Sequence, residues 1–182
     1  MGSIVIKLCG IDEAGRGPLC GPLVVSGVVL HKNIDALDDS KKLSSKKREI
    51  LFEKIIQNSD YFISFSSNID IDRYGLSFCI NRSIREIQQN IQATRYLIDG
   101  NTTFKATNIS CEIKADQKYA QVMAASILAK VSRDRYMIEQ AKIYPKYNFD
   151  KHKGYPTKEH RQLIQLYGLT PIHRRTFKGC KS

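Results

Sequence analysis

The chain has 182 residues, 42% of them hydrophobic, which predicts one globular domain whose core needs no disulfide or structural metal. Lys and Arg number 29 against 18 Asp and Glu, and the net charge of +11 favours an anionic partner such as nucleic acid or a membrane surface. Five cysteines without a C-x-x-C pair argue against a disulfide framework and a zinc ribbon, and predict a reducing, cytoplasmic location.

Five segments are predicted to be strands. The first has alternating apolar residues over 4–9, and the β-branched run LVVSGVVL at 23–30 is predicted to be its hairpin partner. Three further strands are expected, at 61–66, 95–99 and 108–114. The longest apolar run, around 22–30, is far too short to span a bilayer, so we expect no membrane segment.

Helical periodicity appears between and after these strands. The spacing of apolar residues predicts helices at 46–58, 80–91, 121–144 and 158–167. Ser44 or Ser45 is a candidate cap for the first helix, and Thr157 for the last. The order of elements predicts a mixed α/β fold whose sheet begins with antiparallel strands and continues with parallel ones. The regular βαβ alternation of a dinucleotide-binding fold is not present.

A glycine-rich turn, GRGPLCG at 15–21, follows the first predicted strand. It matches neither G-x-G-x-x-G nor a Walker loop, and Pro18 removes an amide that a phosphate-binding nest would use. A nucleotide-cofactor site is therefore a poor interpretation. On the glycines alone, Gly15 and Gly17 are most simply interpreted as a tight turn.

Acidic residues come at three predicted strand ends. Asp12 and Glu13 end the first strand, Asp99 ends the fourth, and Asp116 follows the fifth. Taken singly, each acid is more simply a helix cap, a turn residue or a surface charge. If the strands are neighbours, the four carboxylates converge and need a cation or a shared proton to offset their repulsion. Oxygen ligands without His or Cys suit Mg²⁺ or Mn²⁺, and two such ions can activate a water and stabilise the leaving oxygen of a phosphodiester.

Six motifs occur in one order along nearly the whole chain: GIDEAGRGPLCGPLVV (10–25), DSKKLS (39–44), YLIDGN (96–101), IKAD (113–116), AASILAKVSRDR (124–135) and HKGYPTKEH (152–160). In this order they resemble the type 2 ribonucleases H, and the residues around the turn favour the bacterial ribonuclease HII branch over ribonuclease HIII. The resemblance implies a ribonuclease H-like mixed five-stranded sheet flanked by helices, with a small helical C-terminal part. The implied boundaries are 1–144 for the catalytic domain and 145–182 for an extension that contributes substrate contacts.

The resemblance also implies an activity. Type 2 ribonucleases H hydrolyse the RNA strand of RNA–DNA hybrids and cut on the 5′ side of single ribonucleotides embedded in duplex DNA, leaving 3′-hydroxyl and 5′-phosphate ends. Carried across motif by motif, Asp12, Glu13, Asp99 and Asp116 become the catalytic ligands of two Mn²⁺ or Mg²⁺ ions. These are the same four acids that the predicted strand ends single out.

Substrate contacts follow from the same resemblance. Gly15, Arg16 and Gly17 match the turn that reads the ribonucleotide, because glycines let the backbone approach the sugar closely. Tyr155 matches the tyrosine that hydrogen-bonds the 2′-hydroxyl, which distinguishes RNA from DNA. Lys41 is expected to contact a phosphate near the cut.

Four weaker expectations complete the assignment. Ser126 and Lys130 are secondary candidates for contacts to the nucleic-acid backbone. Asp134 is expected to be a structural acid that pairs with a nearby arginine. The basic tail at 173–181 is a candidate surface for duplex, although a run of charge is more often a solvated face.

Two other functions stay open on the sequence: a hybrid-binding module without catalysis, and a junction resolvase. The intact acid set argues against the first, because a binder gains nothing from clustered carboxylates beside a phosphate. The turn with Tyr155 argues against the second, because a resolvase need not read a 2′-hydroxyl. The expected partners are RNA–DNA hybrids and ribonucleotide-containing duplex DNA. We expect a monomer, no membrane association and no clamp-binding peptide.

Overall fold

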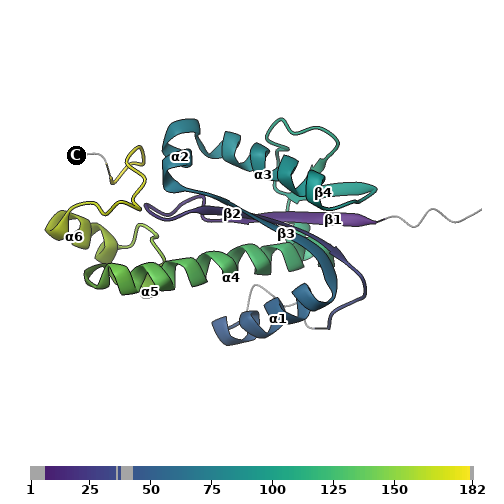
Figure 1. The fold of residues 1–182 in the computed structure, drawn as a ribbon, viewed down its shortest axis with the longest axis horizontal. Coiled ribbons are helices and arrows are strands. Elements are labelled where there is room, and N and C mark those ends of the chain that lie inside the picture. The colour runs from purple at the N-terminus through teal and green to yellow at the C-terminus, as the bar shows by residue number, and fades with distance from the viewer. Residues whose placement is uncertain (1–6, 36, 38–42, 181–182) are drawn as a thin grey trace, which may run out of the picture.

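A computed structural model describes residues 7–35, 37 and 43–180. Its centre is a five-stranded sheet in the order β3-β2-β1-β4-β5 (Figure 1). The strands are β1 (Leu8–Ala14), β2 (Leu23–Leu30), β3 (Ser59–Ser66), β4 (Arg95–Asp99) and β5 (Ser110–Glu112). β1, β2 and β3 pair antiparallel, whereas β4 and β5 add in parallel to β1. The predicted antiparallel start with parallel additions is therefore confirmed.

The first strand lies later in the chain than predicted. Residues 1–6 are outside the described part, and β1 runs on through both acids to Ala14. The backbone explains the extension, because residues 10–14 pair with 24–28 of β2. Asp12 and Glu13 therefore lie inside the strand, in its hydrogen-bonded part, rather than beyond its end. β5 is shorter than the predicted 108–114.

The main helices agree with the apolar spacing. They are α1 (Ser45–Gln57), α3 (Leu76–Asn90), α4 (Ala120–Ile143) and α6 (Lys158–Tyr167). Ser44, one of the two candidates, caps α1 by accepting a 3.3 Å hydrogen bond from the Lys47 amide, and Thr157 caps α6. The prediction missed the short helices α2 (Asn68–Tyr74) and α5 (Phe149–His152) and the 3₁₀ turns η2 (Ala115–Gln117) and η3 (Pro145–Tyr147). A helix of one or two turns is too short to show a periodic apolar face.

Helices cover both faces of the sheet (Figure 1). α3 packs isoleucines against one face, where Ile11 and Val25 are buried. α4 and α1 cover the other face around Val28. α4 approaches β1 at backbone distance, because a Cβ on Gly10 would lie 2.3 Å from the Val122 nitrogen. This close contact brings the first turns of α4 beside Asp12.

Residues 145–180 form a helical part that packs on the glycine-rich turn. A small core joins Cys20 to Met137 of α4 and to Phe149 and Ile172. The Leu19 amide donates to the Gly154 carbonyl at 2.8 Å, and the Arg174 amide donates to the Leu19 carbonyl at 2.8 Å. The C-terminal part is therefore tied directly to the turn. Within the described residues, no helix is long and apolar enough to cross a membrane.

Candidate active site

The structure brings three of the predicted acids together. Asp12 on β1 and Asp99 on β4 lie on neighbouring parallel strands, directly after the paired residues Ile11 and Ile98. Asp116 is in η2, which follows β5. Carboxylate oxygens of Asp12, Asp99 and Asp116 all lie within 4.8 Å of one another. Three of the four carboxylates that were expected to converge therefore do so in the structure.

Short local contacts hold these acids in place. The Ala115 amide donates a 2.7 Å hydrogen bond to Asp99 Oδ1, which joins η2 to the end of β4. Lys114, with φ of 59°, makes the left-handed turn that starts η2. The Glu13 amide donates to Asp12 Oδ1 at 2.8 Å. Asp12 and Asp116 are only 8% and 6% exposed.

Glu13 lies beside this group rather than within it. Its Oε1 accepts a 3.3 Å hydrogen bond from Arg16 Nη1. Its Oε2 is buried and accepts no hydrogen bond from any described residue. Successive residues of a strand face opposite ways, which accounts for the offset from Asp12. A buried carboxylate oxygen without a donor is a candidate ligand position for a cation.

The clustered acids are electrostatically strained without a cation. Burial raises the pKa of Asp12 to about 8, with a further increase from the Glu13 charge, while a hydrogen bond from Ser126 opposes the shift. Burial is also the largest cause that raises the pKa of Glu13, and Arg16 opposes it. A site made only of carboxylate oxygens fits Mg²⁺ or Mn²⁺, which would relieve this repulsion. The hydrogen bond to Asp12 also shows that Ser126, a secondary candidate for a nucleic-acid contact, lies at the acid cluster.

Glycine is required in the first position of the turn. Gly15 has φ of +98°, and a Cβ there would lie 2.4 Å from Arg133 Nε and 2.6 Å from the Pro22 carbonyl. By contrast, a Cβ on Gly17 would meet nothing within 4 Å. The backbone at Gly17 therefore faces space that a ligand can occupy.

A buried arginine that the sequence analysis placed on a duplex-facing tail holds this turn instead. Arg174 is fully buried, and its guanidinium donates to the carbonyls of Gly15 at 2.7 Å and Arg16 at 3.3 Å. It also donates to the carbonyls of Pro18 and Gly21, each at 3.0 Å. Burial lowers its pKa to about 10. The interpretation of residue 174 as part of a solvent-facing basic surface was therefore wrong, because its donors are used by the turn.

A second buried arginine, Arg133 of α4, links the turn to Tyr155. Its guanidinium donates to the carbonyls of Pro22, Cys20 and Lys153, each at 3.0 Å. The guanidinium carbon lies 5.4 Å from the centre of the Tyr155 ring, which is 38% exposed. Arg133 was not predicted as a site residue, because its partners lie between 20 and 113 positions away in the sequence and no local pattern marks it.

Asp134, the next residue of α4, has a different partner from the one predicted. Both of its carboxylate oxygens lie 3.1 Å from Lys130 Nζ. The expected pairing with an arginine was wrong, because Lys130 is one helical turn earlier on the same face. The predicted phosphate contact Lys41 lies outside the described residues.

His160 and His173 form a buried hydrogen-bond network with the Tyr155 backbone, and His152 packs against it. His160 Nδ1 donates to the Tyr155 carbonyl at 3.0 Å, which leaves Nε2 as an acceptor. His173 Nδ1 accepts from the Thr170 amide at 2.9 Å, so its Nε2 carries the proton and donates to His160 Nε2 at 3.1 Å. His152 stacks on His160 with ring centres 4.4 Å apart. The bonds are those of neutral rings, and burial lowers the pKa of His160 and of His173 to about 4.

Two histidines of this network also belong to a second group of side chains that are spaced like the ligands of a metal. Ligand atoms of Cys20, His160 and His173 also lie within 4.8 Å of one another. However, the Thr170 amide fixes the tautomer in which His173 Nε2 is protonated and cannot bind a metal. Burial also raises the pKa of the Cys20 thiol to about 12. The cluster is a hydrogen-bond network that supports the Tyr155 backbone.

Comparison with solved structures defines the class of protein. The Archaeoglobus fulgidus ribonuclease HII in complex with PCNA is 27% identical, with a TM-score of 0.82 over 95% of this chain and 96% of that chain. The ribonuclease H2 of Pyrococcus horikoshii OT3 is 31% identical, with a TM-score of 0.78 over 96% and 95%. A Bst-RNase HIII in complex with Mn²⁺ has a TM-score of 0.72 over 96% and 68%, but at 16% identity it shows the fold alone. The chain thus has a ribonuclease H fold, as predicted.

Sequence comparison then gives the family. The family model for ribonuclease HII matches residues 9–180. A ribonuclease HII from Aliarcobacter butzleri (strain RM4018) is 58% identical over 174 residues, which cover 94% of this chain and 91% of the relative. The chain therefore belongs to the ribonuclease HII family, as a bacterial type 2 ribonuclease H. The predicted family and enzyme class are confirmed.

Proposed function

We propose that this ribonuclease hydrolyses the RNA strand of RNA–DNA hybrids and cuts on the 5′ side of single ribonucleotides in duplex DNA. The products are 3′-hydroxyl and 5′-phosphate ends. The observation that carries the proposal is that carboxylate oxygens of Asp12, Asp99 and Asp116 lie within 4.8 Å of one another, and that Asp12 stands on the strand that leads into the glycine turn. A site of this kind places phosphodiester chemistry beside a backbone able to read a sugar.

The proposed catalytic residues are Asp12, Glu13, Asp99 and Asp116, which would hold two Mn²⁺ or Mg²⁺ ions. When bound, such ions activate a water and stabilise the leaving oxygen. Asp12 is the central ligand, because it is buried on the middle strand and lies within 4.8 Å of Asp99 and Asp116 and next to Glu13 in the chain. Glu13 contributes the oxygen that no described residue satisfies, while Arg16 holds its other oxygen. Which of the two metals acts in the cell is decided by supply as well as affinity.

Substrate selection is proposed to rest on the turn and on Tyr155. The backbone of Gly15, Arg16 and Gly17 would contact the ribose, and the Tyr155 hydroxyl would bond the 2′-hydroxyl. Arg174 and Arg133 position these groups by their bonds to backbone carbonyls. Residues 145–182 are proposed to act as an extension of the catalytic domain that contributes these contacts. Lys41 remains the proposed phosphate contact.

The proposed setting is a cytoplasmic monomer. All five cysteines are free thiols, which fits a reducing compartment. The Archaeoglobus relative is seen with PCNA. For this chain we propose nucleic acid as the partner and expect no clamp-binding peptide.

The function is tested by cleavage of a DNA duplex that bears one ribonucleotide, with and without Mn²⁺, against an all-DNA control. We expect metal-dependent cutting of the first duplex alone, with ends that a DNA ligase or phosphatase assay identifies. Asp12→Asn should bind the duplex and fail to cut it. Asp134→Asn is the matched control, because that acid pairs with Lys130 outside the cluster.

Three outcomes carry distinct meanings. Equal cutting of both duplexes would refute a ribonuclease that reads the sugar. Unchanged cutting by Asp12→Asn would refute the metal assignment. Tight hybrid binding by the wild type without any cutting would favour the alternative of a binding module. Tyr155→Phe should lower cutting at a lone ribonucleotide while leaving the melting temperature unchanged.

A further inference from the structure

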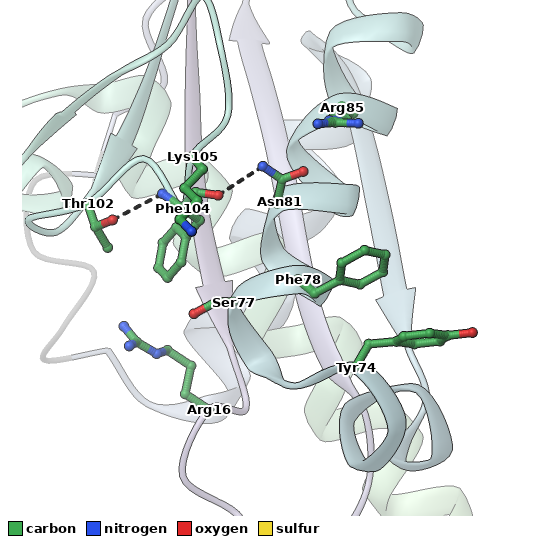
Figure 2. Close-up of a pocket in the computed structure, with 9 residues that line it drawn as sticks. All are labelled: Arg16, Tyr74, Ser77, Phe78, Asn81, Arg85, Thr102, Phe104 and Lys105. Atoms are coloured by element: carbon green, nitrogen blue, oxygen red, sulfur yellow. Dashed lines mark hydrogen bonds between the residues drawn. The ribbon is translucent and has the colours of Figure 1, made fainter.

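A groove opens beside Arg16 of the glycine-rich turn. The groove, of about 690 Å³, lies between Arg16, helices α2 and α3, and the loop that follows β4 (Figure 2). This volume is within the range of protein sites that bind small organic molecules. Because Arg16 bonds Glu13 and also lines this groove, the groove adjoins the acid cluster.

The charge of the groove is positive. Arg16, Arg85 and Lys105 line it, and none of the described residues in its lining is acidic. Asp70 of α2 and Glu86 of α3, which do not line the groove, both pair with Arg82, and this arginine offsets one of their two negative charges. The groove therefore favours an anionic occupant, and a phosphodiester strand supplies a regular row of negative charge.

The groove also presents aromatic rings to solvent. Tyr74 and Phe78 are 45% and 50% exposed, with ring centres 5.0 Å apart. Phe104 lies on the other side of α3 in Figure 2, with the Arg16 guanidinium carbon 5.6 Å from its ring centre. Exposed rings beside cations are the arrangement on which unpaired bases stack. A duplex would leave these rings unused, because its bases already stack on one another.

The loop that forms one wall of the groove is held in a fixed conformation. Phe104 and Lys105 both have positive φ, 53° and 61°, which is unfavourable for residues with side chains. Asn81 of α3 holds this bend by donating a 2.9 Å hydrogen bond to the Phe104 carbonyl, and Thr102 Oγ1 accepts from the Phe104 amide at 3.1 Å. Strain that neighbouring contacts maintain in this way is typical of ligand-binding loops.

We propose that this groove binds an unpaired stretch of nucleic acid that adjoins the duplex at the cleavage site. The cations contact its phosphates, and its bases stack on Tyr74 and Phe78. The inference rests on the proposed function only for the position of the duplex. It extends that function to substrates such as flaps, gaps and junctions, where a single strand leaves the duplex beside the ribonucleotide.

The test measures affinity by fluorescence anisotropy in EDTA, where metal-dependent cutting cannot occur. The probes are a blunt duplex with one ribonucleotide, the same duplex with an oligo-dT tail of about six nucleotides on either end, and the oligo-dT alone. We expect a tail on one side to raise affinity about tenfold. Phe78→Ala should remove most of this gain and leave blunt-duplex affinity unchanged. Arg85→Ala should lower the dependence of log affinity on log salt by about one for tailed duplex.

Phe65→Ala is the matched control. Phe65 is 48% exposed, but it follows Ser64, which bonds Ser83 of α3, so Phe65 faces the other side of the sheet. Equal affinity of the wild type for tailed and blunt duplexes would overturn the inference, as would a full tail effect in Phe78→Ala. A tail effect that depends on Phe78, found together with absent ribonucleotide-dependent cutting, would overturn the proposed function and leave this inference standing.

Discussion

The buried histidine network makes stability sensitive to mild acid. His160 and His173 are 0% and 1% exposed, and their pKa values are lowered from 6.5 to about 4. Between pH 6.5 and 4 the unfolded chain therefore binds protons that the folded chain does not. The free energy of unfolding falls as pH falls through this window, by up to about 1.4 kcal/mol per pH unit for each histidine. Over the whole window each is worth about 3 kcal/mol, a large share of a typical domain's stability.

The perturbation is His160→Gln, measured by urea unfolding in EDTA from pH 7.5 to 4.5. A glutamine can still donate to the Tyr155 carbonyl and accept from His173, but it does not titrate. The slope of unfolding free energy against pH should therefore be shallower than in the wild type by about 1.4 kcal/mol per pH unit near pH 5. Asp12 acts in the opposite direction, since its raised pKa lets the folded chain keep a proton, but this contribution is common to both proteins and cancels in the difference.

His31→Gln is the matched control, because His31 lies on the surface beside Asp60 and its side chain is half exposed. That variant should retain the buried network and therefore the part of the slope that His160 and His173 produce. Identical slopes for the wild type and His160→Gln would refute the reasoning, because they would mean that the buried ring takes up its proton as readily as a solvated one. A variant with a shifted midpoint and an unchanged slope would likewise contradict it.

Three further predictions follow from the acids and the turn. Asp12→Asn should raise the free energy of unfolding in EDTA at pH 7 by on the order of 2–4 kcal/mol, because the buried carboxyl, whose pKa is raised to about 8, takes up a proton on folding that the unfolded chain does not hold at this pH; urea unfolding checks this, and a destabilised variant would contradict it. Gly17→Ala should keep the melting temperature and lose ribonucleotide-dependent cutting, whereas Gly15→Ala should melt at lower temperature because its Cβ would meet Arg133 and the Pro22 carbonyl. Arg174→Met should lose at least about 3 kcal/mol by leaving four carbonyls without their donor, with Arg175→Met as an exposed control of small effect.

Local patterns predicted most of the framework. The β-branched run at 23–30 is β2 with the predicted bounds, and the spacing of isoleucines on α3 matches the face that it buries. The failures are also local in origin. α2 has one buried residue, Ile71, so no apolar face marked it, although Ser67 and Asp70 form a capping box. β1 extends through Asp12 and Glu13 because pairing with β2 outweighs the low strand propensity of acids.

The sequence by itself determined the order of the five strands and the four main helices and singled out four acids at strand ends, because apolar periodicity and strand ends are properties of neighbouring residues. Only the tertiary structure decided what the basic residues do. Arg174 bonds Gly15 across 159 positions of sequence, and Arg133 bonds Pro22 across 111, so neither role is visible in a local pattern. The charge of Arg174 suggested a surface contact. In the structure its guanidinium is buried and donates to four backbone carbonyls of the turn, so it supports the turn from inside. Hydrogen-bond satisfaction inside the fold, rather than residue type, made that choice.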